Sequence, residues 1–415
     1  MNYITYAIPF FVLLMLVEYL WGHFTRNQTY RLNDTLNSLS MGLLSRVVDL
    51  LRLGFAGVVI EAIVRAAGVQ QINTEPLWVW IAAFVAYDFC YYWKHRFGHE
   101  WRILWASHVA HHQSEEFNLS TALRQTGTDY IGFVFYIPLY LVGLPVEVII
   151  TVGSLNLIYQ FWVHTEHIRR LGPIEWVFVT PSNHRVHHAK NPDYIDKNYG
   201  GVFILWDRMF GTFKDEQKDK PCYYGITHAL KSWNPIWANL HMWVETAQLA
   251  WKTKRWRDKF TIWFKPPSWV PEDLPREHYD WQAPRFDPEI TGFTRVYCFA
   301  NYWIVTAAGL AAVLSGDLLT LPMGLIAFGV VAMTLFNHGR MLESHPTATL
   351  LEVVRLIGLV MIGAITPGLW PGLPEWLPKA LFIYSGLSFL ALASSRIMSK
   401  ESYGSIEVSR PLDAR

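Results

Sequence analysis

Long apolar stretches constrain this chain more than any other feature, because a chain that carries several of them folds in a membrane. About 20 apolar residues cross a bilayer as a helix. The chain has 415 residues, of which 52% are hydrophobic and only 17% are charged, whereas soluble domains carry about 25% charged residues. Candidate stretches lie at 4–21, 40–65, 77–93, 130–163, 296–316, 318–336, 356–374 and 380–395. We therefore expect an all-α integral membrane protein, built as a multi-span helical bundle.

Two of these stretches are unusual. Residues 40–65 carry several charges, and the spacings Arg46/Asp49 and Glu61/Arg65 allow ion pairs along one helix. This stretch is expected to span inside a bundle or to lie in the interface. The stretch 130–163 breaks at Gly143-Leu144-Pro145, which predicts a membrane hairpin of two short helices.

The polar segments suggest how the chain is organised. We predict N-terminal membrane helices in 1–75, a histidine-rich catalytic domain with the hairpin in 76–290, C-terminal membrane helices in 291–398 and a polar tail in 399–415. Lys and Arg gather in one set of loops, and the opposite loops contain a single basic residue, Lys379. Loops rich in Lys and Arg stay in the cytoplasm, so the polar side is expected to be cytoplasmic. This orientation requires 40–65 to span.

Composition excludes several classes of protein. Lys+Arg 35 against Asp+Glu 34 argues against nucleic acid as a partner, which would need a basic excess. The three cysteines lie far apart with no CxxC, so neither a disulfide framework nor a zinc ribbon is expected. Residues 251–269 interleave basic and aromatic side chains, which suits the surface of an anionic leaflet. The alternative is a solvated helix with its tryptophans packed inward.

Histidine spacing carries the strongest chemical signal. Sixteen histidines occur, and ten of them form the patterns HxxxH, HxxHH, HxxH and a second HxxHH. Positions i, i+3 and i+4 share one face of a helix, so each group aims its imidazoles the same way. Imidazole ligates iron, zinc, copper or nickel. The candidate metal ligands are His95, His99, His108, His111, His112, His164, His167, His184, His187 and His188.

The number of candidates favours two metal ions. A single tetrahedral zinc takes four ligands, whereas these histidines suffice for two octahedral ions. The first two groups follow one predicted span and the last two follow the hairpin, so all four return to the same side. We therefore predict a cytoplasmic helical cap that carries a histidine-rich dimetal site. The other six histidines are treated as ordinary, although His228 or His241 could face the site.

An all-histidine pair of metals suits oxygen chemistry. Two ferrous ions can share electrons with O2, and the resulting oxidant can cleave an unactivated C–H bond. Because the site lies beside membrane spans, the expected substrate is a lipid drawn from the bilayer. The chain has no GxGxxG or Walker fingerprint, so the reductant is expected to be a small molecule or a separate electron donor. Two other classes stay open: a zinc-dependent membrane hydrolase, and a metal transporter, whose ligands would lie near mid-bilayer. The protease motif HExxH is absent.

At these motifs the chain resembles the fatty acid hydroxylase/sterol desaturase superfamily of integral-membrane non-haem diiron enzymes. The similarity is greatest to its alkylglycerol monooxygenase branch. It is carried by HRFGHE, ILWASHVAHHQSEEFNLSTALRQ (103–125), LIYQFWVHTEHI (157–168), LGPIEWVFVTPSNHRVHHAKN (171–191) and DKNYGGVFILWDRMFGTF (196–213).

The resemblance implies two iron ions and tetrahydrobiopterin as the external reductant. It also implies hydroxylation of the carbon next to the ether oxygen of an alkylglycerol, which then falls apart into a fatty aldehyde and a glycerol. Within the superfamily, hydroxylation or desaturation of sterols, carotenoids or fatty acids is the alternative. Glu100 and Glu166 match acidic positions of the branch, which implies that they orient ligands in a catalytic role. His167 departs from the branch, which has an apolar residue there.

Overall fold

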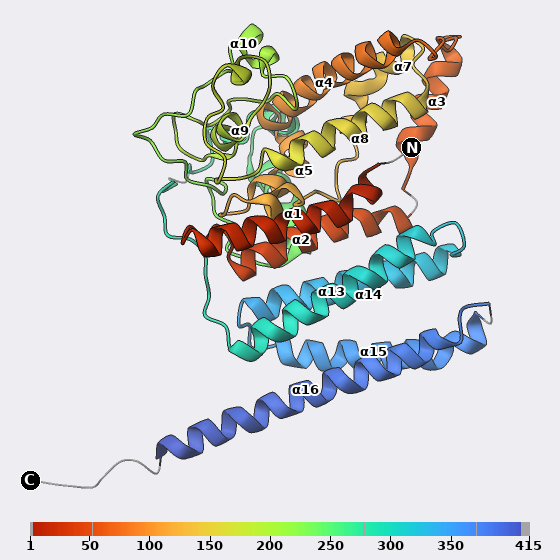
Figure 1. Ribbon diagram of the computed structural model, residues 1–415, viewed down its shortest axis with the longest axis vertical. Coiled ribbons are helices and arrows are strands. Elements are labelled where there is room, and N and C mark those ends of the chain that lie inside the picture. The colour runs from red at the N-terminus through yellow and green to blue at the C-terminus, as the bar shows by residue number, and fades with distance from the viewer. Residues whose placement is uncertain (1–2, 52, 277–278, 371, 408–415) are drawn as a thin grey trace, which may run out of the picture.

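The computed structural model describes residues 3–51, 53–276, 279–370 and 372–407, and this part of the chain is helical. Long helices run roughly side by side, the loops and short helices drawn in green gather at one end, and other short helices lie at the opposite end (Figure 1). Within the described residues, β-structure is limited to two isolated bridges, Phe178–Phe203 and Ala189–Tyr224. The predicted all-α class is confirmed.

The long helices are α1 (Ile4–Phe24), α2 (Leu32–Val47), α4 (Leu77–Glu100), α8 (Val146–Trp162), α11 (Pro235–Lys252), α13 (Gly292–Leu314), α14 (Leu321–Leu342), α15 (Ala348–Leu369) and α16 (Trp376–Glu407). The shorter ones are α3 (Phe55–Ala66), α5 (Arg102–His112), α6 (Leu119–Ala122), α7 (Ile137–Leu141), α9 (Pro181–His188), α10 (Leu205–Phe210) and α12 (Trp256–Thr261). Four 3₁₀ turns complete the described chain: η1 (Val48–Leu51), η2 (Gly132–Tyr136), η3 (Gly172–Trp176) and η4 (Ile262–Phe264).

Five of these helices are long and apolar enough to cross a bilayer: Tyr6–Phe24, Gly292–Leu314, Leu321–Leu342, Ala348–Leu369 and Trp376–Ser395. They confirm the first predicted stretch and the four C-terminal ones, and the chain is a multi-pass membrane protein. The third C-terminal helix starts at Ala348 rather than at Leu356. The charged residues Glu352 and Arg355, which interrupt the apolar run, lie inside the bundle as an ion pair of 2.5 Å, so the helix continues through them.

Of the two alternatives for residues 40–65, a spanning helix and an interfacial segment, the structure rules out one continuous spanning helix. Helix α2 ends at Val47, the 3₁₀ turn Val48–Leu51 follows, and α3 begins only at Phe55, directly after Gly54. Helix α2 buries as many polar as apolar residues, among them Asn37 and Ser38, so it packs against protein rather than lipid. Neither α2 nor α3 reaches the length of about 20 residues that a crossing requires. The crossing that the orientation argument required is therefore not present as a single helix.

The segments around the histidines are also less membrane-like than expected. Helix α4 covers the predicted span 77–93 but continues to Glu100, and it is not among the five apolar helices. The break in the hairpin is confirmed, because α7 and α8 meet at Gly143, which has a left-handed φ of +90°. However, the apolar arms Gly132–Leu141 and Val146–Trp162 are both shorter than a full crossing.

Buried carboxylates tie the helices to the loops at the histidine end. Asp88, the single charge in 77–93, accepts hydrogen bonds from the Val202 amide at 2.9 Å and from the Asn156 side chain at 2.7 Å. Glu18 in α1 accepts a hydrogen bond from the Thr165 hydroxyl at 2.5 Å. A buried carboxylate is tolerated only when it is hydrogen-bonded in this way. These charges therefore fix the cap onto α1, α4 and α8.

The aromatic and basic segment 251–269 forms part of the surface. Trp251 is 85% exposed and Trp256 is 73% exposed, with Phe260 and Phe264 also exposed. The alternative in which these tryptophans pack inward is therefore wrong for Trp251 and Trp256. Phe264 stacks edge-on against Trp101 at the end of α4, so this surface adjoins the helix that carries the first histidines.

Candidate metal centre

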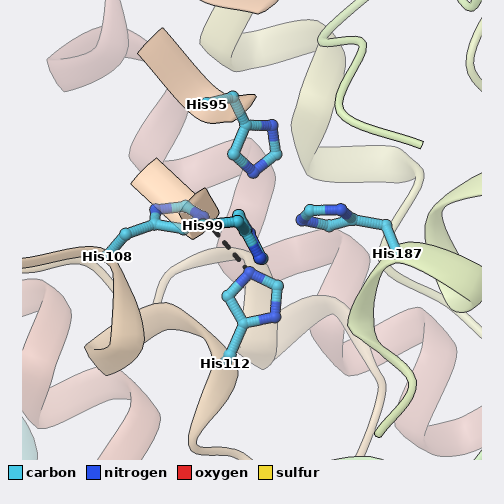
Figure 2. A group of neighbouring side chains, drawn as sticks. All are labelled: His95, His99, His108, His112 and His187. Carbon is cyan, nitrogen blue, oxygen red and sulfur yellow. Dashed lines mark hydrogen bonds between the residues drawn. The ribbon is translucent and has the colours of Figure 1, made fainter. Parts of the chain in front are cut away.

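Nine of the ten predicted histidines come together in two adjoining groups. The first group is His95, His99, His108, His112 and His187, and the second is His111, His164, His184 and His188. Within each group the candidate ligand nitrogens lie within 4.8 Å of one another. Figure 2 shows the five rings of the first group, which converge from α4, α5 and α9.

Helical spacing explains how the groups form. His95 and His99 lie one turn apart on α4, and His108 and His112 lie one turn apart on α5, so each pair shares a face. The neighbouring His111 points off that face and joins the second group. The histidines of α9 divide in the same way: His184 and His188 belong to the second group, and His187 belongs to the first.

Backbone carbonyls orient several of the rings. Nδ1–H groups donate to carbonyls in four cases: His95 to Tyr199 at 2.7 Å, His111 to Arg124 at 2.9 Å, His164 to Gln160 at 2.8 Å and His187 to Lys197 at 3.0 Å. A carbonyl only accepts hydrogen bonds, so each of these Nδ1 atoms carries the proton. The Nε2 atom of each ring is then left with a lone pair, which is the arrangement that metal-binding imidazoles adopt.

The Nε2 contacts show that a cation fits the second group. His164 Nε2 lies 3.3 Å from His111 Nε2 and 3.0 Å from His184 Nε2. The Nε2 atoms of His111 and His164 are both unprotonated, so their lone pairs face each other, which is unfavourable without a cation between them. A metal bound at about 2.1 Å would put neighbouring nitrogens about 3.0 Å apart in an octahedron and about 3.4 Å apart in a tetrahedron. The observed distances fall in that range.

The first group has more nitrogens than a tetrahedral metal can use. Five imidazoles surround one point there, whereas structural zinc takes four ligands. The Nε2 atoms of His95, His99 and His187 are buried and make no hydrogen bond within the described chain. Unpaired buried acceptors of this kind are costly, and a six-coordinate ion would satisfy all five while leaving one position open.

Burial keeps the rings neutral. It lowers the pKa of His111 to about 4 and the pKa of His187 to about 3, in each case mainly because the charged form would lose its water. For His108, burial comes first and the neighbouring histidines and Lys94 lower the pKa further. The rings are therefore uncharged near neutral pH and available to bind a metal.

The loop 196–201 supports the first group, and the sequence did not reveal this role. The Asp207 carboxylate accepts hydrogen bonds from the backbone amides of Tyr199 at 2.7 Å and Gly200 at 2.8 Å, and this fixes the carbonyl that receives His95. Asp196 lies 3.6 Å from Nδ1 of His99. The string DKNYGG contains this loop and contributes to the resemblance, but only the fold shows which of its atoms face the histidines.

The remaining candidates lie outside the two groups. His167 is part-exposed, with Nε2 3.4 Å from Thr29 Oγ1, so its position gives no support to a ligand role. Glu100 pairs with Arg96 at 2.8 Å. Glu166 is half-buried, and burial, reinforced by Glu116, raises its pKa to about 7. The catalytic roles of both glutamates stay predictions.

His228 and His241, which were treated as ordinary although either could have faced the site, do not join it. The His241 ring contacts the Ala238 carbonyl at 3.3 Å and belongs to neither group, and His228 also lies outside both.

A cavity of about 540 Å³ leads to both groups. It touches His95 and His108 of the first group and His111 and His164 of the second. Elsewhere its wall is formed largely by apolar side chains of α1, α2, α8 and α13, and small-molecule sites measure about 300–1,000 Å³. The cavity therefore connects the apolar helices with the metal centre.

Neutral imidazoles in two adjoining groups, at the end of a cavity between membrane helices, define a metal-dependent membrane enzyme. Comparison with known proteins narrows this class. The profile of the fatty acid hydroxylase family matches residues 80–212, which include all nine grouped histidines. No solved structure matches the chain significantly.

Two alkylglycerol monooxygenases match most of the chain, and a lipid hydroxylase matches part of it. The alkylglycerol monooxygenase of Xenopus tropicalis is 35% identical over 86% of this chain and 81% of its own length. The human alkylglycerol monooxygenase is 35% identical over 87% of this chain and 82% of its own length. The ornithine lipid hydroxylase OlsE of Rhizobium tropici is 31% identical over 35% of this chain and 45% of its own length.

The chain belongs to the alkylglycerol monooxygenase family and carries its fatty acid hydroxylase domain. It is an oxidoreductase, a membrane-bound monooxygenase that acts on a lipid.

Proposed function

We propose that this enzyme binds two iron ions and uses O2 to hydroxylate the carbon next to the ether oxygen of alkylglycerols. The observation that carries the proposal is the cavity, which reaches both histidine groups from between apolar helices. An amphiphile with a long chain and a small polar head suits such a space. The names of the relatives supply the substrate class.

In this proposal each histidine group holds one ion. His95, His99, His108, His112 and His187 would bind the first ion, and His111, His164, His184 and His188 the second. A pair of ferrous ions supplies the electrons that activate O2 for attack on a C–H bond. The protein contributes oriented nitrogen atoms, because carbonyl acceptors hold Nδ1–H and leave Nε2 facing the centre. Five imidazoles in one group exceed what zinc takes, which weighs against a zinc hydrolase.

The reaction needs an external reductant. One oxygen atom of O2 enters the C–H bond, and the other leaves as water after taking up two electrons and two protons. The hydroxylated ether is a hemiacetal, and its C–O bond to glycerol breaks to give a fatty aldehyde and glycerol. We propose tetrahydrobiopterin as the source of the two electrons, with a separate electron donor as the alternative.

We also propose that the centre faces the cytoplasm. The C-terminal spans carry this argument without a crossing at 40–65. Their loops 315–320 and 370–375, which lie across the membrane from the histidine-rich segment that enters α13, contain no Lys or Arg, whereas residues 164–291 contain many. A reduced pterin made in the cytoplasm would reach such a site directly.

The test is product analysis with purified protein loaded with ferrous iron and supplied with O2 and reduced tetrahydrobiopterin. The panel contains 1-O-hexadecylglycerol, a sterol and a fatty acid. We expect hexadecanal to form from the ether lipid and not from the other two compounds. When the O2 is labelled with ¹⁸O, the aldehyde should carry the label, which immediate reduction to hexadecanol preserves. Oxidation of the sterol or the fatty acid, with the ether left intact, would reject the substrate class.

A further inference from the structure

The cavity that leads to the histidines contains an ion pair in its wall. Lys94 Nζ lies 2.6 Å from Asp129 Oδ2, and both residues line the cavity together with His95 and His108. Lys94 directly precedes His95 on α4. The pair therefore lies beside the first histidine group and is in contact with the space that a substrate would occupy.

The pair is open to the cavity. The side chains of Lys94 and Asp129 keep 29% and 32% of their surface accessible, although protein atoms surround both. An ammonium has three N–H donors, of which this ion pair occupies one. The carboxylate accepts from Lys94 and from the Gly132 amide at 3.0 Å, and it has further lone pairs. The pair can therefore both donate to and accept from a bound hydroxyl group.

The neighbouring turn holds the pair in place. A Cβ atom on Gly132 would fall against Cε of Lys94 and would come within 2.5 Å of Asp129 Oδ1, so any larger residue here would displace the two side chains of the pair. The ring of Tyr136 lies 5.8 Å from Nζ of Lys94. The ion pair is thus packed on one side and accessible on the other, as a preformed binding site would be.

The position of the pair along the chain fits the polar head of a lipid. Lys94 directly follows the apolar stretch 77–93, and Asp129 directly precedes the apolar stretch 130–163. The cavity wall also includes apolar side chains, among them Ile8 and Phe11 from α1 and Leu310 from α13. An alkyl chain among these side chains leaves its polar end for the ion pair.

The charges on the cavity wall balance. Arg46 and Lys94 are matched by Asp49 and Asp129. A phosphate head would need an excess of positive charge, whereas uncharged hydroxyl groups need donors and acceptors. The lining therefore suits an uncharged head group with more than one hydroxyl.

We propose that Lys94 and Asp129 bind the two free hydroxyl groups of the glycerol head and so place the ether-adjacent carbon beside the histidine groups. This inference rests on the proposed function, because it takes alkylglycerols as the substrate class. The inference goes further by naming the residues that would distinguish a glycerol head with free hydroxyl groups from one whose hydroxyl groups are substituted.

The experiment measures binding to metal-free protein in lipid nanodiscs, where no turnover occurs. The ligands are 1-O-hexadecylglycerol and its 2,3-di-O-methyl derivative, which keeps the ether and the chain but has no hydroxyl donors. Wild-type protein should bind the free diol at least about tenfold more tightly, since hydrogen bonds to charged groups are among the strong ones. In Asp129→Asn, which removes the charged acceptor for the hydroxyl groups, the two ligands should bind within about twofold of each other. Lys94→Met removes a donor that the oxygen atoms of both ligands can use, so it should weaken the binding of both.

Matched controls use the exposed ion pair Glu61–Arg65 on α3, which does not line the cavity. Arg65→Met and Glu61→Gln remove the same kinds of charge and should keep the wild-type preference. Asp129→Asn preserves the shape of the side chain, and an unchanged iron content after reloading shows that a variant is folded. In the loaded enzyme, both cavity variants should raise KM for the diol and should shift part of the product from hexadecanal to ethers hydroxylated along the chain.

The outcomes separate the two proposals. If wild-type protein binds neither ether, the substrate class is wrong and the inference fails with it. The ion pair does not bind the head group, although the substrate class stands, if wild-type protein binds both ethers equally or if Asp129→Asn keeps the preference for the diol. The same conclusion holds if Lys94→Met binds both ethers as tightly as the wild type. Loss of the preference in the exposed-pair controls would also overturn the inference.

Discussion

Replacing His164 by alanine should remove one metal ion and leave the other bound. His164 belongs to the group of four, and its Nε2 lies 3.0 Å from that of His184 and 3.3 Å from that of His111. The group of five does not contain it. The variant therefore leaves three imidazoles for one ion and all five for the other.

The size of the effect follows from the number of ligands. Four-ligand structural zinc sites bind with about 10–16 kcal/mol, which is roughly 2.5–4 kcal/mol for each ligand when shared equally. Losing one ligand of four should then weaken the second ion by roughly 10²- to 10³-fold, at 1.4 kcal/mol for each factor of ten. The first ion should keep its wild-type affinity.

The assay is iron per chain, measured by plasma mass spectrometry after dialysis against a weak chelator, together with hexadecanal formation. We expect about two ions in the wild type and one in His164→Ala, since only the second group is affected. His167→Ala is the matched control, because it lies three residues away in the same loop and outside both groups. It should keep both ions.

Two results would refute this reasoning. Two tightly bound ions and full activity in His164→Ala would mean that the group of four is not a metal site. Loss of one ion in His167→Ala would mean that His167 binds a metal ion, contrary to its position outside both groups.

Three further predictions concern other parts of the molecule. Glu352→Gln should lower the thermal midpoint of unfolding in detergent, because removing one partner of a buried ion pair costs about 3–5 kcal/mol. The double variant Glu352→Gln/Arg355→Met should regain much of the lost stability. If it does not, the loss does not come from leaving Arg355 unpaired. Gly132→Ala should displace the side chains of Lys94 and Asp129, so it should abolish the preference for the free diol while iron stays bound. An unchanged preference would count against the close packing of Gly132 on this ion pair. A nitroxide on Trp256→Cys should be more accessible to dissolved oxygen than to a water-soluble nickel chelate, because this exposed aromatic surface suits the membrane interface; the reverse ranking would place it in water.

The sequence was sufficient to predict the helices that face lipid. A long apolar run has few alternatives in a membrane, and α1 and α13–α16 lie where such runs occur. The prediction failed where apolar residues alternate with charges. Residues 40–65 looked like one helix, but the polar side chains of α2 pack against protein and the chain breaks before Phe55. Hydropathy cannot distinguish a helix surrounded by lipid from one surrounded by protein.

The sequence also could not reveal the partners of the imidazoles. Four of the acceptors are backbone carbonyls, such as those of Tyr199 and Arg124, and every residue has a carbonyl. The cavity pair has the same difficulty, because Lys94 and Asp129 are 35 positions apart and neither belongs to a motif. Such contacts depend on which loops the fold brings together.

The grouping of the histidines is the step that spacing alone predicts incorrectly. The i, i+3, i+4 spacing predicts that all three imidazoles of an HxxHH box face the same way. On a helix, however, consecutive residues point about 100° apart, so His111 and His112 cannot face the same point. The structure sends His112 to one group and His111 to the other, and it divides His187 from His188 in the same way. Each HxxHH box therefore spans both groups, and two such boxes facing each other are enough to hold two ions side by side. A site built in this way couples its two halves, because any movement of α5 or α9 displaces ligands of both groups at once.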